Sequence, residues 1–308
     1  MELNRTICVT EGSNTGFGDC VLNPSYMAGA FLAPTNFVIT KENIAGLQAF
    51  LMAAASAALQ QNRIFPVHYF EQIETNSEDK TIVTLGYGGK AVVKEGDYDW
   101  AFQFFQGGLC LHKALRVFNG PGKSVYFYDA NGVLYGTKDG DNLKPIPLSY
   151  FWADPWKPND GTNATIYMAQ FVFKPKYINE NIGFIKTDFN LEDIKGLQTV
   201  AIKEAAQSAF PVLKIKAITG CAGEDLFDTY AAELAVVDAW RATSGGAEIA
   251  ITSVSQDAAL KAWTITVDTA DANYNPDAVF QINLVNPPAL TALAVVGFEG
   301  KALTIATA

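Results

Sequence analysis

The chain has 308 residues, of which 49% are hydrophobic and 18% are charged, and its 32 acidic and 22 basic side chains give a net charge of −10. A chain of this length buries a substantial core and commonly divides into two domains. The acidic balance, with no cluster of Lys and Arg, excludes a dedicated nucleic-acid binder, because neutralising phosphates requires gathered cations.

The chain shows no segment typical of membrane insertion or export. It does not open with a basic stretch followed by an apolar core, so we expect no signal peptide. The longest apolar run, residues 44–59, is diluted by Gly46, Gln48 and several Ala, and it is shorter than the roughly 20 apolar residues that span a bilayer. We therefore expect no membrane partner.

Two segments of the chain are near copies of each other. Glu42–Gln48 reads ENIAGLQ and Glu192–Gln198 reads EDIKGLQ, 150 residues further on. Each copy is followed by an Ala-rich stretch that ends in Phe-Pro-Val. A repeated start, body and end indicates duplicated architecture, which is typical of self-assembling shells and tubes.

Both copies carry the pattern of a helix. Thr40 and Asn190 stand where side-chain oxygens cap a first helical turn, and apolar residues then recur at spacings of three and four. The sequence predicts helices near residues 41–61 and 191–209, each with one face on a sheet. Gly46 and Gly196 destabilise these helices by about 1 kcal/mol each, so we expect a neighbouring backbone to approach closely at both.

The segments around the first predicted helix have the pattern of β-strands. They are rich in β-branched and aromatic residues and are separated by Gly, Pro, Asn and Asp. The predicted strands are residues 64–73, 81–87, 91–94, 98–106, 124–128 and 165–173.

Asn131-Gly132 predicts a tight type I′ turn between two long strands. The same segment begins at Asp129 like a calcium loop, but its twelfth position is Gly140 where a bidentate Glu is required. We therefore interpret it as a hairpin. Asp139 and Asp141 are interpreted as part of a solvated turn.

A proline-rich stretch, residues 142–161, predicts a long, partly extended connection rather than a central strand. It either reaches a neighbouring subunit or wraps its own domain. Its aromatic residues Tyr150, Trp152 and Trp156 are the candidate intersubunit contacts, since large rings bury much area with few rotors to immobilise. The same rings also suit a sugar-binding platform, or a plug at one end of the sheet domain.

After Pro211 the predicted strands become shorter and turn residues more frequent. About seven strands in about a hundred residues are what an immunoglobulin-like (Ig-like) sandwich needs. Trp240 and Trp263 are its candidate core aromatics. The sequence thus predicts a mainly β (α+β) protein: residues 1–210 form a β-sandwich or barrel domain with packed helices, and residues 211–308 form an Ig-like β-sandwich.

No catalytic, cofactor or metal motif is present, so we expect no enzyme, cofactor or metal site. His68 and His112 are expected to have structural or surface roles. A pair of carboxylates for glycoside hydrolysis is recognised only in space, so that enzyme class stays open. The four widely spaced cysteines form no C-x-x-C pair, and they are expected to be buried, reduced thiols.

A sheet-rich body with a flanking helix, the hairpin segment 125–137, the Asn159-Asp160-Gly161 loop and an Ig-like C-terminal domain together resemble tailed-bacteriophage virion proteins, in particular tail-tube (major tail) proteins. The resemblance implies a structural protein that assembles with itself into symmetric rings around a channel, through which DNA passes as non-specific cargo. It further implies other virion proteins as partners and assembly in the host bacterial cytoplasm. The alternatives are a capsid-auxiliary or neck virion protein, and a carbohydrate-binding module.

Overall fold

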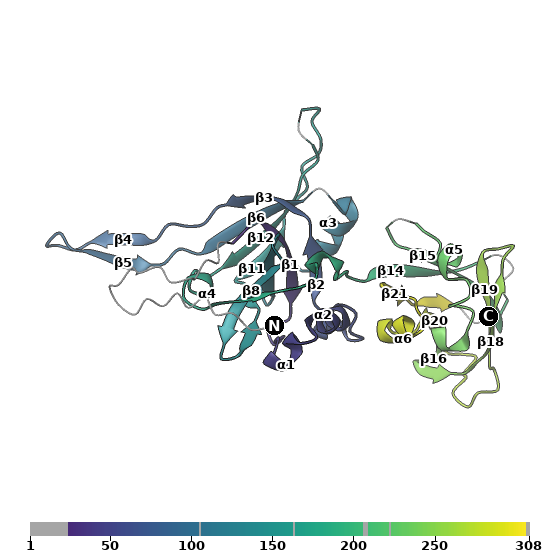
Figure 1. Cartoon of the computed structure of the whole chain (residues 1–308). Coiled ribbons are helices and arrows are strands. Elements are labelled where there is room, and N and C mark those ends of the chain that lie inside the picture. Colours follow the sequence, from purple (N-terminus) through teal and green to yellow (C-terminus); the bar gives the residue numbers. More distant parts are fainter. Residues whose placement is uncertain (1–23, 105, 163, 206–208, 222, 306–308) are drawn as a thin grey trace. The chain divides into compact units, whose positions relative to one another are not determined.

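The structure is a computed structural model that describes residues 24–104, 106–162, 164–205, 209–221 and 223–305 (Figure 1). The chain divides into two compact units. Unit 1 extends to residue 195, and unit 2 contains residues 56–58 and everything from residue 196 onward. This division lies ahead of the predicted domain boundary at residue 210. Both units are built mainly of strands, so the prediction of a mainly β fold is confirmed.

The first sheet of unit 1, sheet A, is antiparallel and buried on both faces. Its strands are β1 (Met27–Ala33), β2 (Phe65–His68), β7 (Ser124–Asp129), β8 (Val133–Asp139), β9 (Asn142–Lys144), β10 (Ile146–Pro147) and β13 (Ile182–Lys186). The main path is β13-β8-β7-β1-β2, and off this path β9 pairs with β8 and β10 with β7. Every residue of the central strand β7 is buried, as expected for a strand that is covered on both sides.

The second sheet of unit 1, sheet B, covers one face of sheet A. Its strands are β3 (Phe70–Thr75), β6 (Tyr98–Phe104), β11 (Tyr150–Ala153) and β12 (Tyr167–Phe173), in the order β11-β12-β6-β3. The chain passes from β2 in sheet A to β3 in sheet B at Tyr69, whose φ of 63° lies in the left-handed region. Side chains of both sheets form one hydrophobic cluster that includes Phe102, Phe127 and Phe171.

The other face of sheet A is covered by helices, which appear purple beneath β1 in Figure 1. They are α1 (Lys41–Ile44) and α2 (Leu47–Ala55), and their apolar side chains pack on the outward residues of β1 and β7. The predicted first helix therefore exists, but it is interrupted at Gly46. An added Cβ at Gly46 would meet no atom within 4 Å, so the expected close backbone approach there is wrong.

The second predicted helix, near residues 191–209, does not form. The chain makes one 3-10 turn at Leu191–Asp193, where the Asn190 side chain accepts a hydrogen bond from the Glu192 amide, and then enters strand β14 (Gln198–Glu204). Val200 and Ile202 are buried in the core of unit 2, whereas Thr199 and Lys203 are exposed and Ala201 is half-buried. Pairing with two neighbouring strands supplies the burial that a single helix face would not, and it overrides the helical spacing.

The predicted first helix ends early: α2 stops at Ala55, and a separate 3-10 turn, Gln60–Asn62, occupies its predicted end. Two helices of unit 1 were not predicted, α3 (Gly108–Arg116) and α4 (Lys176–Asn179). Helix α3 contacts β11 and β12 and inserts Leu115 into the core between the sheets. Its apolar positions Leu111 and Leu115 are four residues apart, with cationic side chains in its last turn, and this amphipathic pattern is the signal in the sequence.

The predicted β7–β8 hairpin is present, with a different turn. Its loop has three residues, Ala130 to Gly132, and only Gly132 is left-handed, at a φ of 74°. The Asp129 carboxylate accepts hydrogen bonds from the amides of Asn131 (2.9 Å) and Val133 (3.0 Å). This side-chain bond replaces the second left-handed residue that a type I′ turn requires.

Unit 2 consists of two facing sheets with a common core. The strands are β14, β15 (Val212–Thr219), β16 (Trp240–Ser244), β17 (Ala247–Ile249), β18 (Ile251–Asp257), β19 (Ala262–Val267), β20 (Phe280–Leu284), β21 (Phe298–Lys301) and β22 (Leu303–Ile305). One sheet has the order β18-β19-β15-β14-β21 and the other β17-β16-β20-β22. Short helical elements lie at Phe227–Tyr230 (α5), Val237–Ala239 (η3) and Pro287–Ala292 (α6).

The predicted core aromatics of unit 2 are confirmed. Trp240 and Trp263 are both buried, and their ring centroids lie 5.7 Å apart. Each indole N–H donates to a backbone carbonyl oxygen, that of Leu234 at 2.8 Å and that of Ala231 at 3.0 Å. The buried polar atoms of both rings are therefore satisfied. Among the described residues, no helix has the length and apolar character that crossing a bilayer requires.

Replacing Gly136 by Ala is expected to destabilise unit 1 by about 1–3 kcal/mol, the usual effect of overpacking. The added Cβ would overlap the carbonyl oxygen of Lys144 and crowd Leu143 on β9. Urea unfolding measures the change. The matched control is Gly46→Ala, which meets open space and should change stability by at most about +1 kcal/mol. Equal losses in the two variants would contradict this packing account.

Candidate functional site

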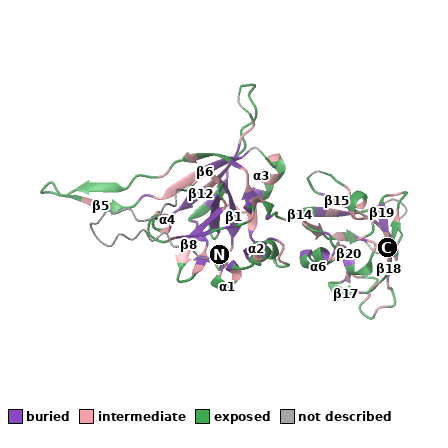
Figure 2. Ribbon diagram, in the orientation of Figure 1, coloured by how far each residue is buried: buried purple, intermediate pink, exposed green. Residues whose placement is uncertain are grey.

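The most unusual feature of unit 1 is a projecting hairpin, which we call the arm, residues 76–97. Strands β4 (Thr81–Thr84) and β5 (Lys90–Lys94) pair only with each other, beyond the end of sheet B, as Figures 1 and 2 show. The two strands are rich in β-branched residues. The turn between them is closed by hydrogen bonds between Leu85 and the Gly88–Gly89 pair. The local sequence therefore favours a hairpin even without a core beneath it.

The arm exposes apolar side chains on both of its faces. All residues from 81 to 90 are exposed, and so are Val92 and Val93 on the returning strand. The exposed apolar residues of the arm are Ile82, Val83, Leu85, Tyr87, Val92 and Val93. A lone two-stranded hairpin is only marginally stable in water, and apolar side chains gathered on a projection indicate an interaction surface.

The base of the arm is fixed to sheet B by its backbone. The ladder between β3 and β6 continues outward, with the Asn76 amide donating to the Asp99 carbonyl oxygen (2.9 Å) and the Glu78 amide to that of Asp97 (3.1 Å). Gly96 is buried there and packs so closely against the opposite strand that an added Cβ would overlap the Glu78 carbonyl oxygen. Only glycine allows the two chains to approach this closely.

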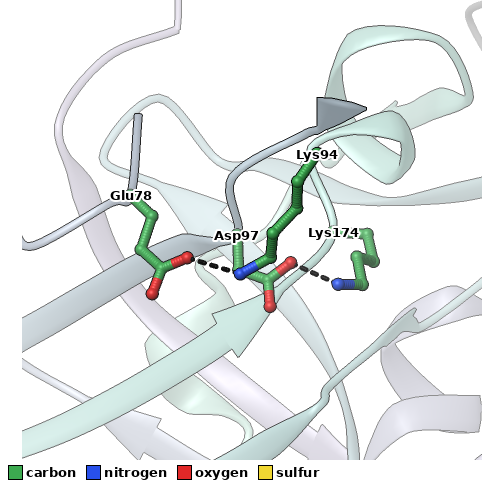
Figure 3. A network of polar contacts seen from close by, with 4 residues as sticks. All are labelled: Glu78, Lys94, Asp97 and Lys174. Carbon is green, nitrogen blue, oxygen red and sulfur yellow. Dashed lines mark hydrogen bonds and ion pairs between the residues drawn. The ribbon is translucent and has the colours of Figure 1, made fainter. Parts of the chain in front are cut away.

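Two ion pairs lie at the base of the arm (Figure 3). One joins the two strands of the arm, and the other joins the arm to the end of β12. Lys94 lies 3.0 Å from Glu78, and Lys174, just after β12, lies 2.5 Å from Asp97. The Lys94–Glu78 pair is largely exposed, so its contribution to stability is small. The close backbone packing at Gly96 is therefore the stronger constraint on the direction of the arm.

The predicted contact residues lie on and beyond the edge strand β11. Tyr150 and Trp152 are 39% and 43% exposed, whereas Phe151 and Ala153 between and after them are buried in the core. The strand thus turns both rings to the outer face of sheet B and not into the domain as a plug. Trp156 is 42% exposed and lies in the loop between β11 and β12, the teal projection at the top of Figure 1.

Polar side chains share the outer face with these rings. Strand register places Gln170 beside Trp152 and Asp99 in the row of Tyr150, and Asp154 follows two residues after Trp152 on the same side. Gln170 donates to one oxygen of Asp99 at 2.8 Å, while the other oxygen, Oδ1, is buried without a hydrogen-bond partner. Glu74 on β3 accepts from Gln103 at 2.5 Å.

The carboxyls of this face influence one another's pKa. Burial, and then the negative charge of Asp99, raise the pKa of Asp154; Lys157 and His112 act in the opposite direction, and Glu74 adds to the rise. Burial raises the pKa of Asp99, and burial with both aspartates raises the pKa of Tyr150. We call Glu74, Asp99, Tyr150, Trp152 and Asp154 the acidic aromatic face.

Both histidines bind backbone carbonyl groups. His68 on β2 contacts the Ile194 carbonyl oxygen through Nε2 (2.8 Å) and the Tyr128 hydroxyl through Nδ1 (2.5 Å). Nε2 of His112 on α3 lies 2.5 Å from the Asp154 carbonyl oxygen. These contacts agree with the structural role that the sequence predicts. Neither imidazole contacts Tyr150 or Trp152 through them.

The expectation of buried, reduced thiols is wrong for both described cysteines. Cys110 on α3 and Cys221 in unit 2 are exposed and disulfide-bonded. Cys8 and Cys20 lie outside the described residues. Widely spaced cysteines carry no sequence signal of pairing, because the partners are set by the fold.

Within the described ranges no group of three or more His, Cys, Asp or Glu side chains is arranged to hold a metal ion. Asp139 pairs with Lys144 at 2.6 Å and Asp141 with Lys41 at 3.8 Å, as expected for charges in a solvated turn. The Asp129 carboxylate accepts from backbone amides and from the Tyr135 hydroxyl at 2.8 Å. This segment is therefore a hairpin and not a calcium loop.

No protein-family model matches this chain, and comparisons with curated proteins and with solved structures likewise find no match.

Gly96→Ala is expected to loosen the base of the arm. The new Cβ must displace the Glu78 backbone, so the amides of Asn76 and Glu78 should exchange with deuterium roughly tenfold faster, equivalent to about 1.4 kcal/mol of local opening. Gly86→Ala in the turn meets open space and is the control. Unchanged exchange in the Gly96 variant would show that the base is not held by this contact.

Acidification is expected to destabilise unit 1 through His68. Burial lowers its pKa below the ordinary 6.5, so the unfolded chain binds the proton more readily. The contribution of neutral His68 is therefore complete above about pH 6.5 and is lost as the pH falls through the folded-state pKa. Urea unfolding at about pH 8 and about pH 5 should show a larger loss for the wild type than for His68→Gln. Equal losses would contradict this linkage.

Proposed function

We propose that this chain is a structural subunit that assembles with copies of itself into symmetric rings, as a component of a phage tail tube or a tube-like part of a virion. The observation that carries the proposal is the arm, whose base is fixed by close packing while its apolar side chains are exposed on both faces. Such a surface is stable in water when a second subunit covers it.

The architecture of unit 1 supports this assignment. It has two facing sheets with a helix layer on the outer face of one sheet, and tail-tube proteins resemble sandwich or barrel domains with a packed helix. Unit 2, with its five- and four-stranded sheets around Trp240 and Trp263, is proposed to be an Ig-like domain.

The composition is compatible with a channel for DNA. A net charge of −10 would let a ring repel passing phosphates, so DNA is proposed as non-specific cargo, with other virion proteins as partners. The proposed location is the virion, assembled in the host bacterial cytoplasm. The disulfide bonds of Cys110 and Cys221 suit an oxidising environment, which a released particle meets.

The test is the oligomeric state of the purified full chain and of an arm variant. The wild type should form rings or tubes in negative-stain micrographs and sediment as an oligomer at micromolar concentration. Ile82→Ser combined with Val92→Ser should weaken association at least about tenfold, because two apolar side chains leave the interface. The control carries Val279→Ser and Val296→Ser, which replace exposed valines of unit 2.

Circular dichroism and thermal unfolding must show that both variants keep the fold. A wild type that stays monomeric, or an arm variant that assembles as well as the control, would sink the proposal. A closed trimer or single ring without tubes would assign the chain to a neck or capsid-auxiliary part. Glycan-array binding by a monomer would support carbohydrate binding instead.

A further inference from the structure

The distal part of the arm, residues 80–94, is cationic within an acidic chain. It contains Lys80, Lys90 and Lys94 and no Asp or Glu, so it carries +3. The whole chain carries −10, and the remaining 293 residues therefore carry −13. Lys94 pairs with Glu78, whereas Lys80 and Lys90 are exposed and make no ion pair within the described chain. The base of the arm adds Glu78, Asp79, Glu95 and Asp97, so the arm as a whole carries −1 and the positive charge is confined to its distal part. Electrostatics thus favour contact between this distal part and an acidic surface of a second copy.

One face of the arm combines this charge with apolar surface. The register pairs Ile82 with Val92 and Thr84 with Lys90, so the four side chains point to the same side of the hairpin. Ile82 and Val92 are 47% and 52% exposed. A matching surface must offer rings or other apolar groups together with a carboxylate beside them.

The acidic aromatic face has this chemistry. The exposed rings of Tyr150 and Trp152 can accept β-branched side chains and the stem of a lysine. Beside them, Asp99 and Asp154 present half-buried carboxyls, and the negative charge of Asp99 contributes to the raised pKa of Asp154. A cation from outside would relieve the repulsion between these two carboxyls.

We propose that the arm of one copy lies on the acidic aromatic face of a second copy, with Lys90 against the carboxyls of Asp99 and Asp154. This inference rests on the proposed function and names the two surfaces that join. The lysines of two distal arm segments repel each other, and so do the carboxyls of two acidic aromatic faces, whereas Lys90 and the carboxyls attract, so charge favours the mixed pairing. A lipid surface is the other partner for a cationic apolar hairpin; the second copy is favoured because the same chain carries the matching carboxyls and rings.

The test uses charge reversal in the full-length chain. Lys90→Glu and Asp154→Lys, made separately, should each weaken sedimentation-monitored association at least about tenfold. An equimolar mixture of the two variants should assemble again, because each altered arm then meets an altered face and each native arm a native face. Lys203→Glu, an exposed lysine of unit 2, has the same change in net charge as Lys90→Glu and should assemble like the wild type.

The possible failures are distinguishable. Unchanged assembly in both single variants, or a mixture that stays dissociated, overturns this pairing and leaves the proposed function intact. A wild type that never assembles overturns the proposed function itself. For the lipid surface, Tyr87→Trp reports on the turn of the arm: a blue shift of its fluorescence with phosphatidylcholine–phosphatidylglycerol vesicles would overturn the second copy as partner, and no shift is expected.

Discussion

The two sheets of unit 1 are held together by packed aromatic rings, and the rest of the unit depends on this contact. The ring of Phe127 in sheet A lies 5.7 Å from Phe102 and 5.3 Å from Phe171 in sheet B, centroid to centroid. Pairs of this kind contribute about 0.5–1.5 kcal/mol each beyond the area that they bury. Strand β6, which carries Phe102, continues into the base of the arm. The core therefore fixes the strand from which the arm starts, and the packing at Gly96 fixes the direction in which the arm leaves it.

Burial of the second face of sheet A explains where unit 1 ends. Ile194 is fully buried in the cluster formed by α2 and β7, and His68 binds its carbonyl oxygen. Directly after this point the chain buries Val200 and Ile202 and joins a different core. The two near-copy segments thus have different roles. Ile44 of the first segment is the last residue of helix α1 and is buried in this cluster. Ile194 of the second segment is buried in the same cluster, and the chain leaves unit 1 directly after it.

Strands could be predicted because their signal is local, whereas the second helix depended on distant partners. Residues 212–219, rich in β-branched side chains, form β15. Trp240 and Trp263 are large apolar residues, and this size predicted their place in the core of unit 2. Ile194, Leu197 and Ala201 have a helical spacing, whereas Val200 and Ile202 have the spacing of a β-strand, and only pairing with β15 and β21 decides between the two patterns. The sequence pointed to Tyr150 and Trp152, which lie exposed on β11, as candidate contact residues. It did not show that β4 and β5 are exposed on both faces, because their sequence pattern resembles that of an ordinary strand in a sheet. The carboxyls gathered beside Tyr150 come from three strands and their loops, so their proximity follows from register alone.

A contact between two different surfaces of the same chain has a consequence for assembly. If two copies exchange arms reciprocally, the result is a closed dimer; if they do not, each added copy leaves one arm and one face free. Such contacts generate a ring if the rotation per copy closes and a helical filament if it does not. Exposed charges are screened over about 8 Å at physiological salt, so the lysines mainly select the partner and orient it. In the proposed contact the apolar side chains of the arm would supply most of the affinity, and the close packing at Gly96 would set the angle at which one copy meets the next.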